Sequence, residues 1–503
     1  MELEFHGATD GTTGSCHILR AGGKQILLEC GLFQGHRTDT YKRNSTFRFE
    51  PRSIDAVVLS HAHIDHSGRL PMLVRGGFQG PIHSTGATVD LAEPMLLDSA
   101  NIQLKDAEFL NKRRVMDKVR ARHEHRSEHR SERRRTRAGL AHFHTHDDAP
   151  ALEVSNPPTR EVLPLYLEED VRDTLPLFVP HHWGDWFSIG PNLRVRLHDA
   201  GHILGASWVE CEARERGRTT RLVFSGDYGR PQPILRDPVP LAPADVLICE
   251  STYGDRCHPP VDDTEAQLSL AVERLHKRRR GKLLIPAFAV GRTQHILYAL
   301  SRIFEIKKIA DIPVYVDSPL AKRATEIVYK HRECFDDDAL ARLRKAESGE
   351  HRLKVHFTQT VDDSKALNMA KGPAVIISAS GMMESGRILH HLAWSIASPD
   401  TEIAVVGYQA QGTLGRRLVD GAREVNILGM LHAVRARVTV MNGFSAHADR
   451  DGLLATLTPL APLCKALFLV HGENDQRIPL ARSLGQRGFA RVECPRSAAL
   501  WKL

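Results

Sequence analysis

The stretch His61-Ala62-His63-Ile64-Asp65-His66 directly follows an apolar run, Ile54 to Leu59, and gathers four metal-capable side chains within six positions. Neutral imidazole nitrogen and carboxylate oxygen are ligands that zinc prefers. The two histidines of the HxH pair can close on one ion from a strand-to-loop turn, and the Asp-His pair then points at a second ion. A histidine-rich surface loop is the alternative, but a loop that served only stability would not gather four costly polar groups. The stretch therefore predicts a metal centre at the end of a buried strand.

The composition indicates a globular protein with more than one domain. The chain has 503 residues, of which 42% are hydrophobic and 26% charged. No apolar run reaches the roughly 20 residues of a membrane helix, and Met1 to Phe5 lacks the basic and apolar parts of a signal peptide. The eight cysteines form no CxxC pair, as is usual in a reducing compartment. We therefore expect a cytoplasmic protein without a membrane span.

The basic excess of the chain lies in one segment. Residues 112–137 hold twelve Lys or Arg and four Asp or Glu, a net charge of +8 against +7 for the whole chain. Such a segment can bind a polyanion by releasing counterions, or it can be a solvated, poorly ordered arm, and the pattern is compatible with both. Arginines recur every four residues from Arg122 to Arg134 and would stack like charges on a helix, so disorder until a partner binds is one expectation. The proline- and acid-rich residues 149–164 are expected to form a linker.

Ionisable residues repeatedly follow the short apolar strands expected elsewhere in the chain. Five strands show this arrangement: 192–197 leads to His202, 222–224 to Asp227, 246–248 to Glu250, 438–440 to His447, and 467–470 to His471. Open α/β sheets build their sites just beyond the carboxyl ends of strands. One such residue would mean little, since either His202 or His447 alone could be a structural loop histidine. Six events, counting the first motif, indicate one shared site.

Between about Cys249 and Met441 the pattern changes to a repeated order of strand, loop and helix. Helices are expected near 293–304, 321–330 and 386–393, each after a short apolar strand. This alternation predicts a parallel sheet covered by helices. The intervening loops are rich in small residues, and loops of this kind at helix N-termini are natural phosphate seats. Each loop taken singly is more often only a tight turn.

These motifs resemble those of the metallo-β-lactamase superfamily and, within it, of the β-CASP nucleases. The superfamily motifs are matched by His61-x-His63-x-Asp65-His66, Gly201-His202 and Ser225-Gly226-Asp227. The three β-CASP motifs are matched in order by Glu250 in Glu250-Ser251-Thr252-Tyr253-Gly254, His447 in Phe444-Ser445-Ala446-His447-Ala448-Asp449, and His471 in Val470-His471-Gly472-Glu473. The resemblance covers nearly the whole chain. It implies an α/β fold, a metallo-β-lactamase αββα sandwich with an inserted β-CASP domain whose parallel sheet is flanked by helices.

The resemblance also implies how the chain is divided. Residues 1–247 and 442–503 would form the metallo-β-lactamase domain, and residues 248–441 the β-CASP domain. Residues 112–163 would be a basic insertion and linker, since family members tend to pass directly from an Asn-Lys-Arg-Arg segment, here Asn111 to Arg114, to a Pro-Leu-Tyr segment, here Pro164 to Tyr166.

The resemblance implies a site with two zinc ions. One ion would be held by His61, His63 and His202, the other by Asp65, His66 and His471, and Asp227 would bridge them. Two metals ~3.5–4 Å apart can stabilise the attacking and leaving oxygens of a phosphodiester displacement, and a metal lowers the pKa of bound water toward ~7. His447, oriented and charged by Glu250, would protonate the leaving 3′-oxygen, so the catalytic set is Asp65, Glu250 and His447. The expected products carry a 5′-phosphate and a 3′-hydroxyl.

The function implied in this way is that of a zinc-dependent ribonuclease acting on single-stranded RNA. His471 favours RNA because DNA-repair members of the family tend to have an apolar residue at that position. The family implies an endonuclease, with 5′-exonuclease action as a further mode, and a homodimer. RNA would thread between the two domains, with candidate contacts at Ser380, Gly381, Arg292, Arg387 and Gly407; for the arginines, solvated helix starts are the equal alternative.

Two departures from the family pattern keep other functions open. The family usually has aspartate in a Leu-Asp-Cys-Gly context where this chain has Leu28-Glu29-Cys30-Gly31. That carboxylate orients a ligand histidine, and such a partner can change activity or metal affinity by ~10–100-fold. The basic insertion is the second departure. The alternatives are an RNA-binding β-CASP protein with weak or lost catalysis, a DNA nuclease of the same superfamily, and a hydrolase of a small ester, which would need no large covering domain.

Overall fold

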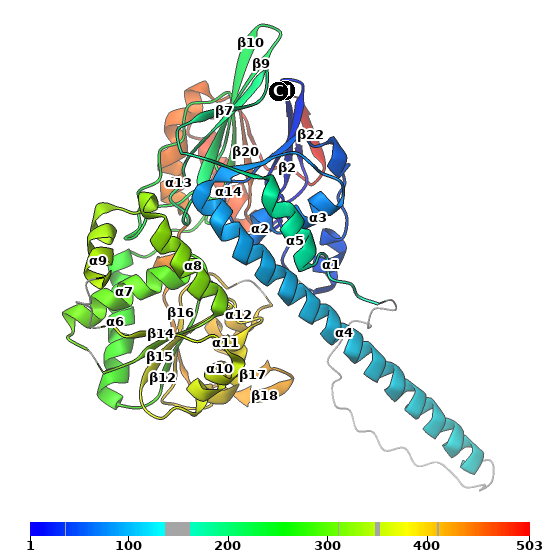
Figure 1. The fold of residues 1–503 in the computed structure, drawn as a ribbon, viewed down its shortest axis with the longest axis vertical. Helices are drawn as coiled ribbons and strands as arrows, with labels where there is room; N and C mark the ends of the chain where they lie inside the picture. Colours follow the sequence, from blue (N-terminus) through cyan, green and yellow to red (C-terminus); the bar gives the residue numbers. More distant parts are fainter. Residues whose placement is uncertain (36, 136–160, 310, 348–352, 410–411, 503) are drawn as a thin grey trace.

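The computed structural model describes residues 1–35, 37–135, 161–309, 311–347, 353–409 and 412–502 (Figure 1). Within these ranges the strands form two seven-stranded sheets, one six-stranded sheet and one two-stranded hairpin. The two large sheets stack face to face, and the six-stranded sheet forms a separate layer with its own helices (Figure 1). This arrangement confirms the predicted sandwich with an inserted helix-flanked parallel sheet.

The first seven-stranded sheet joins the two ends of the chain. Its strands, in the order β22-β1-β2-β3-β4-β5-β6, are β22 (Ala499–Lys502), β1 (Glu2–Phe5), β2 (His17–Ala21), β3 (Lys24–Leu28), β4 (Ala56–Val58), β5 (Ile82–Thr85) and β6 (Phe178–His181). β1 and β22 pair antiparallel, with Phe5 opposite Ala499.

The second seven-stranded sheet carries most of the strand ends that matter for function. Its strands, in the order β21-β20-β11-β10-β9-β8-β7, are β21 (Val492–Glu493), β20 (Ala466–Val470), β11 (Val246–Glu250), β10 (Arg218–Phe224), β9 (Ser207–Glu215), β8 (Leu193–Asp199) and β7 (Trp186–Gly190). β11 and β20 are parallel neighbours with Glu250 opposite Val470, so more than 200 residues are inserted between two adjacent strands. β11 continues in this sheet to Glu250, three residues past the predicted boundary at 247.

Alternating apolar side chains of each strand form the core on two faces. In β3, Ile26 and Leu28 pack into the layer between the two sheets, whereas Leu27 packs toward the covering helices, as the two-residue period of a strand requires. The helices of this part are α1 (Arg37–Asn44), α2 (Ile64–Ser67), α3 (Leu70–Arg75), α4 (Gly86–Arg135), α5 (Glu168–Thr174), α13 (Arg450–Leu457) and α14 (Asn474–Gly485).

The inserted sheet is parallel throughout. Its strands, in the order β14-β13-β15-β12-β16-β19, are β14 (Val355–Phe357), β13 (Val314–Asp317), β15 (Ala374–Ser378), β12 (Lys282–Pro286), β16 (Glu402–Val405) and β19 (Arg437–Val440). Leu283 and Ile285 of β12 pack on one face, and Leu284 packs on the other. The helices here are α6 (Val261–Arg278), α7 (Arg292–Ile306), α8 (Pro319–Lys330), α9 (Asp337–Glu347), α10 (Val361–Met369), α11 (Arg387–Ser395) and α12 (Leu414–Val419), and a hairpin joins β17 (Glu424–Ile427) to β18 (Met430–Ala433).

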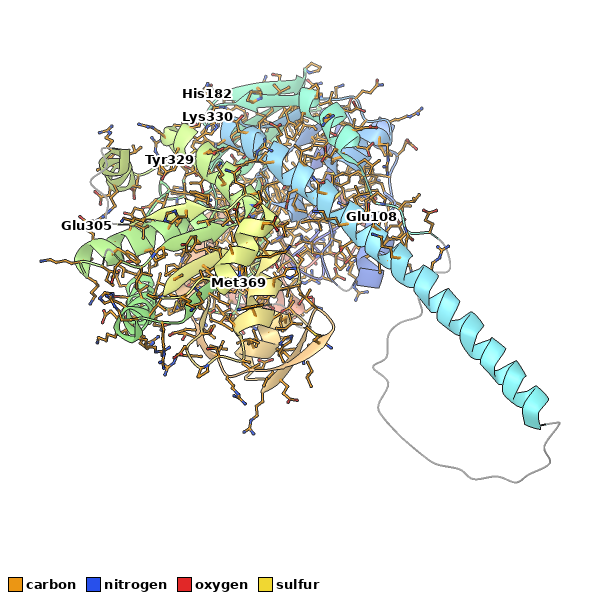
Figure 2. The ribbon with its side chains drawn as sticks, turned by 60° about the horizontal axis from the view of Figure 1, so that its bottom comes forward. Glu108, His182, Glu305, Tyr329, Lys330 and Met369 are labelled. Atoms are coloured by element: carbon orange, nitrogen blue, oxygen red, sulfur yellow. The ribbon has the colours of Figure 1, made fainter. Side chains whose placement is uncertain are left out.

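The basic segment belongs to a helix up to Arg135, in contrast to the expected disorder. α4 spans 50 residues. Asp90, in the second turn of α4, lies 2.5 Å from Lys330 at the end of α8. Beyond Glu108 the helix extends away from the body of the protein (Figures 1 and 2). The i,i+4 repulsion between like charges costs only a few tenths of a kcal/mol, and the high helix propensity of Arg, Lys and Glu outweighs it. Most of the predicted linker, 149–160, lies outside the described residues. No helix in the described ranges is both long and apolar enough to cross a bilayer.

Candidate metal centre and active site

The loop after β4 is fixed against the end of β3. The amide of Cys30 donates to the carbonyl of His66 over 2.7 Å. Gly31 lies so close to the loop that a Cβ there would stand 1.6 Å from the carbonyl oxygen of Asp65, so only glycine fits. α2 begins directly after His63, which is its N-cap residue. A tight turn followed by one turn of helix therefore directs the side chains of the motif toward one point.

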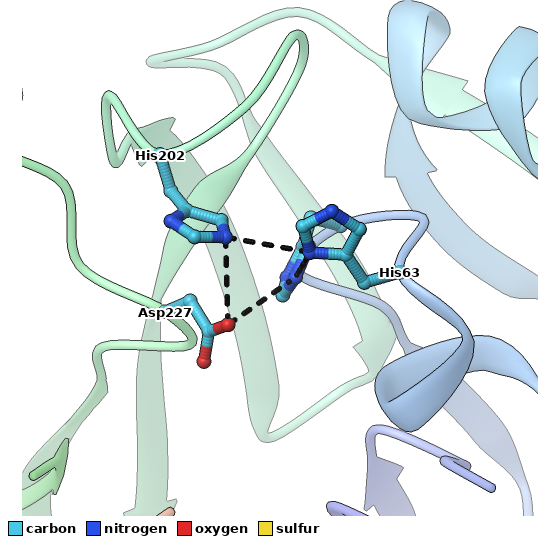
Figure 3. Close-up of side chains that lie close together, drawn as sticks. His63, His202 and Asp227 are labelled. Atoms are coloured by element: carbon cyan, nitrogen blue, oxygen red, sulfur yellow. Dashed lines mark hydrogen bonds and ion pairs between the residues drawn. The ribbon is translucent and has the colours of Figure 1, made fainter. Parts of the chain in front are cut away.

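Three histidines and an aspartate from three different loops converge beside this turn (Figure 3). The Nδ1 atom of His63 lies 3.1 Å from Nε2 of His61 and 3.4 Å from Nε2 of His202, in the loop after β8. The Oδ2 atom of Asp227, in the loop after β10, lies 3.5 Å from Nε2 of His61 and 3.5 Å from Nε2 of His202. The four ligand atoms thus face a common centre.

A second cluster shares Asp227 with the first. His66 and His471 approach each other with their Nε2 atoms 3.2 Å apart, and the Oδ2 atom of Asp65 lies 3.5 Å from Nε2 of His471. The Oδ1 atom of Asp227 lies 3.3 Å from Nε2 of His66 and 3.3 Å from Nδ1 of His471. One oxygen of Asp227 therefore faces each cluster.

The donor set fits a divalent metal ion. Ligand atoms in contact lie 3.1–3.5 Å apart, close to the ~3.3 Å edge of a tetrahedron whose zinc–ligand arms are ~2.0–2.1 Å. Burial holds the pKa of His61 and of His202 well below the usual value, so both rings are neutral and offer a lone pair. The Oδ1 atom of Asp227 is buried without a hydrogen-bond partner among the described residues. A buried carboxylate oxygen that accepts no hydrogen bond in the described part of the chain and lies 3.3 Å from a nitrogen of His66 and of His471 is what a bound cation would satisfy.

Glu29 holds one of the ligand histidines. Its Oε2 atom lies 2.8 Å from Nδ1 of His66, and its Oε1 atom accepts a hydrogen bond of 2.6 Å from the amide of Ser60. Glu29 is fully buried, and its backbone has a positive φ of 66°. The Glu29 carboxylate thus lies beside His66, as the sequence predicted, and Nε2 of His66 is turned toward Asp227.

Replacing Glu29 with glutamine is expected to weaken metal binding by ~10–100-fold, because the neutral amide no longer attracts the Nδ1 proton of His66. The measurement is zinc affinity by competition with a chromophoric chelator. Glu29→Asp is the control, since it keeps the charge and shortens the side chain by one methylene. Equal zinc affinity in the glutamine variant and the native protein would contradict this role.

The buried Glu250 and the half-buried His447 form a pair beside the candidate metal ligands. Nδ1 of His447 lies 3.0 Å from both carboxylate oxygens of Glu250, and the rings of His447 and His202 lie 4.5 Å apart. Glu250 is fully buried and also accepts a hydrogen bond of 2.6 Å from the amide of Tyr228. Burial alone would lower the pKa of His447, but the charge and hydrogen bond of Glu250 outweigh it and raise that pKa to about 9. His447 therefore tends to carry a proton, with Nε2 on the far side from Glu250.

A cavity of about 290 Å³ opens over both clusters, and two of the five predicted substrate-binding residues line it. Arg292 and Gly407 line it, together with His63, Asp227 and His447.

Ser380, Gly381 and Arg387 are not among the residues that line this cavity. Arg387 donates to Asp317 over 2.7 Å and to the carbonyl of Gln359 over 2.8 Å, so its charge is paired within the inserted domain. Their role in substrate binding stays a prediction.

Sequence reasoning missed several side chains of the cavity. Phe288, 43% exposed, and the half-buried Tyr408 line it from loops of the inserted sheet, and Tyr253 lies 6.0 Å from the ring of His447. Gln294 and His295 line it from the first turn of α7. Phe288, Tyr408 and Tyr253 are scattered along the chain, so no local cluster of aromatic residues in the sequence predicted them.

Three family models match successive parts of the chain. They are described as the metallo-beta-lactamase superfamily (residues 9–172), the Beta-Casp domain (residues 293–418) and the Zn-dependent metallo-hydrolase RNA specificity domain (residues 432–495). A solved structure, described as a protein of unknown function from Enterococcus faecalis V583, is similar with a TM-score of 0.52 and 10% identity over 100% of this chain and 99% of that one. At this identity the likeness concerns the fold alone.

Several named proteins are similar over most of this chain. "Ribonuclease TTHA0252" of Thermus thermophilus is 34% identical over 97% of both chains. Two proteins named "Transcription termination factor FttA", from Methanothermobacter thermautotrophicus and Pyrococcus abyssi, are 27% and 28% identical over 93% and 94% of this chain. This chain spans 66% and 67% of their length. Because three family models match successive parts of the chain and the Thermus protein is 34% identical over 97% of it, the chain belongs to the β-CASP family of the metallo-β-lactamase superfamily.

Proposed function

We propose that this protein is a zinc-dependent ribonuclease that uses two metal ions to hydrolyse phosphodiester bonds of single-stranded RNA. The observation that carries the proposal is Asp227, whose two oxygens each face a separate cluster of ligand atoms. His61, His63 and His202 would hold one ion, and Asp65, His66 and His471 the other. Similarity to a protein named ribonuclease and to a model described as an RNA specificity domain supports RNA as the substrate.

The residues of the site would have different roles in the reaction. When bound, a pair of zinc ions supplies an activated water and stabilises charge on the phosphate. Asp65 and Asp227 would supply the negative charge that balances the two cations. His447, which lines the cavity and turns Nδ1 to Glu250, would donate its Nε2 proton to the leaving 3′-oxygen. This assignment gives a 5′-phosphate and a 3′-hydroxyl.

Zinc-loaded protein is expected to cleave an end-labelled single-stranded RNA and to leave a DNA of the same sequence intact. A strong chelator should abolish cleavage, and added zinc should restore it. The label reports the cut position, which separates endonucleolytic from 5′-exonucleolytic action, and phosphatase treatment of the products reports the end chemistry.

The other outcomes of this assay each select another function. Equal cleavage of DNA would indicate a DNA nuclease, and tight RNA binding without turnover at stoichiometric zinc would indicate an RNA-binding protein with a dead site. Cleavage that persists in the chelator would contradict a metal-dependent reaction altogether.

We also propose a homodimer, a cytoplasmic location and the predicted division into residues 1–247 with 442–503 and residues 248–441, with the first boundary moved to the end of β11 at Glu250. The location is supported by the eight cysteines, all of which are free thiols. Sedimentation equilibrium of the purified protein tests the dimer.

A further inference from the structure

Three polar side chains of the first turn of α7 line the cavity, and each has at least one nitrogen or oxygen atom without a hydrogen-bond partner in the described part of the chain. Arg292, Gln294 and His295 all line the cavity. Nε and Nη1 of Arg292, Oε1 of Gln294 and Nε2 of His295 are buried, and none has a hydrogen-bond partner within the described ranges. Gln294 is 8% exposed and His295 is 6% exposed. Buried polar atoms are paired in most folded proteins, and unpaired ones that share a cavity point to a ligand.

The unpaired atoms are held in place by contacts on their other sides. Nε2 of Gln294 donates to the carbonyl of Ala289 over 3.1 Å and to Oγ1 of Thr325 over 2.9 Å. Because a carbonyl can only accept, this contact fixes which end of the amide is nitrogen, and Oε1 is left as a free acceptor. The ring of His295 packs edge-on against Phe444 with centroids 5.1 Å apart. The turn is therefore preorganised rather than free to rotate toward solvent.

Arg292 differs from Arg387, another half-buried arginine of this domain. Arg387 is neutralised by Asp317 at 2.7 Å, whereas the groups that act on Arg292 are Tyr253 and the cation Arg230. Burial lowers the pKa of Arg292 to about 10, so the guanidinium is still charged at neutral pH. A half-buried cation whose Nε and Nη1 atoms are buried without a hydrogen-bond partner among the described residues is costly to the fold, and an anionic ligand would offset that cost.

The walls beside this turn are apolar. Ile203, Leu204, Leu235, Val290 and Val328 line the same cavity. An apolar pocket with a few fixed polar groups is typical of a site that takes a flat heterocycle by its edge. A lone inorganic anion would not need these walls.

We propose that the first turn of α7 is a nucleotide subsite of the RNA path, in which Arg292 binds a backbone phosphate and Gln294 and His295 hydrogen-bond the edge of the adjoining base. The proposal deepens the ribonuclease function and rests on it. Oε1 of Gln294 accepts from a base N–H, and Nε2 of His295 forms the second contact. The subsite would favour an unpaired nucleotide, because the Watson–Crick edge of a base in a duplex is already occupied by its partner.

Arg292→Gln tests the phosphate contact. It is expected to raise KM for a ten-nucleotide RNA by about 10- to 100-fold, as expected for losing a hydrogen bond to a charged group, with a smaller change in kcat. The Kd of the same fluorescein-labelled RNA, measured by anisotropy in a chelator so that no cleavage occurs, should rise in parallel. Arg423→Gln is the matched control, since Arg423 is exposed in the same domain and absent from the cavity lining.

Thermal stability separates this role from a structural one. Removing an unpaired buried charge should leave the Tm of Arg292→Gln equal to or above that of the native protein, whereas loss of a structural contact would lower it. A Kd and KM within twofold of the Arg423→Gln values would overturn the phosphate contact.

His295→Phe tests the base contact while keeping the packing against Phe444. An RNA series in which one abasic nucleotide is moved along the ten positions should show a position where the native protein loses about 3- to 10-fold in affinity. The phenylalanine variant should already have lost that affinity and be insensitive to the abasic position. Equal sensitivity of both proteins at every position would overturn the base contact.

Failure of the subsite and failure of the ribonuclease function give different results. If the native protein binds RNA in an Arg292-dependent manner and cleaves nothing, the subsite stands and the catalytic proposal fails. If the native protein cleaves RNA with Arg292→Gln unchanged, the catalytic proposal stands and the subsite fails.

Discussion

Asp227→Asn is expected to abolish RNA cleavage, by on the order of 10³-fold or more in kcat, and to reduce the bound zinc. Oδ1 and Oδ2 of Asp227 each lie within 3.5 Å of two histidine nitrogens. Asparagine keeps the shape of the side chain but has only one oxygen, and that oxygen is neutral. One cluster therefore faces an NH2 group where it had an oxygen acceptor, and both clusters lose the negative charge. Zinc per chain by atomic absorption, together with single-turnover cleavage of a labelled RNA, measures both effects.

Asp362→Asn is the matched control for this change. The Asp362 side chain is 92% exposed and pairs only with Lys365 at 3.3 Å among its described contacts, so the same carboxylate-to-amide change there should leave zinc content and cleavage as in the native protein. An Asp227→Asn protein that kept two zinc ions per chain and more than a tenth of the native rate would rule out the shared carboxylate.

His447→Ala is expected to lower kcat by about 10²–10⁴-fold, the usual contribution of a positioned general acid, with zinc content unchanged. The pH profile carries the more specific result. Because the pKa of His447 is raised to about 9, the protonated acid is present below that pH, and kcat/KM should fall as pH rises through it. In Glu250→Gln the negative charge beside Nδ1 is lost, the pKa of His447 falls, and the alkaline limb should move to lower pH.

Glu473→Gln provides the control for the pH profile. Glu473 also lines the cavity, but its carboxylate accepts a hydrogen bond from the hydroxyl of Tyr408 over 3.4 Å and lies in no described contact with His447. Its alkaline limb should therefore coincide with the native one. If the alkaline limb of the pH profile were unchanged in Glu250→Gln, Glu250 would not set the pKa of His447.

The convergence of the candidate metal ligands could be predicted from the sequence because they follow directly after apolar strands. His202, Asp227 and His471 come just beyond β8, β10 and β20, and the parallel or antiparallel order of one sheet brings such strand ends to the same edge. The contact of Glu29 with His66 was predictable for the same reason, since β3 and β4 are neighbours.

Contacts that depend on side-chain packing could not be predicted in this way. Arg387 was a candidate for phosphate binding, but its partner Asp317 lies 70 residues away, and no local pattern links the two. The unpaired atoms of Gln294 and His295 are visible only once the surrounding loops are in place. The helical course of α4 was missed because a small repulsion between like charges was given more weight than the propensity of the same residues for helix.

The shared register of β11 and β20 has a consequence for the timing of biosynthesis. His471, the last of the seven candidate ligands along the chain, is placed only when β20 pairs with β11, and β1 gains its outer neighbour only when β22 pairs with it. A nascent polypeptide emerging from the ribosome therefore lacks a complete metal centre until residue 471 has been translated and β20 has docked.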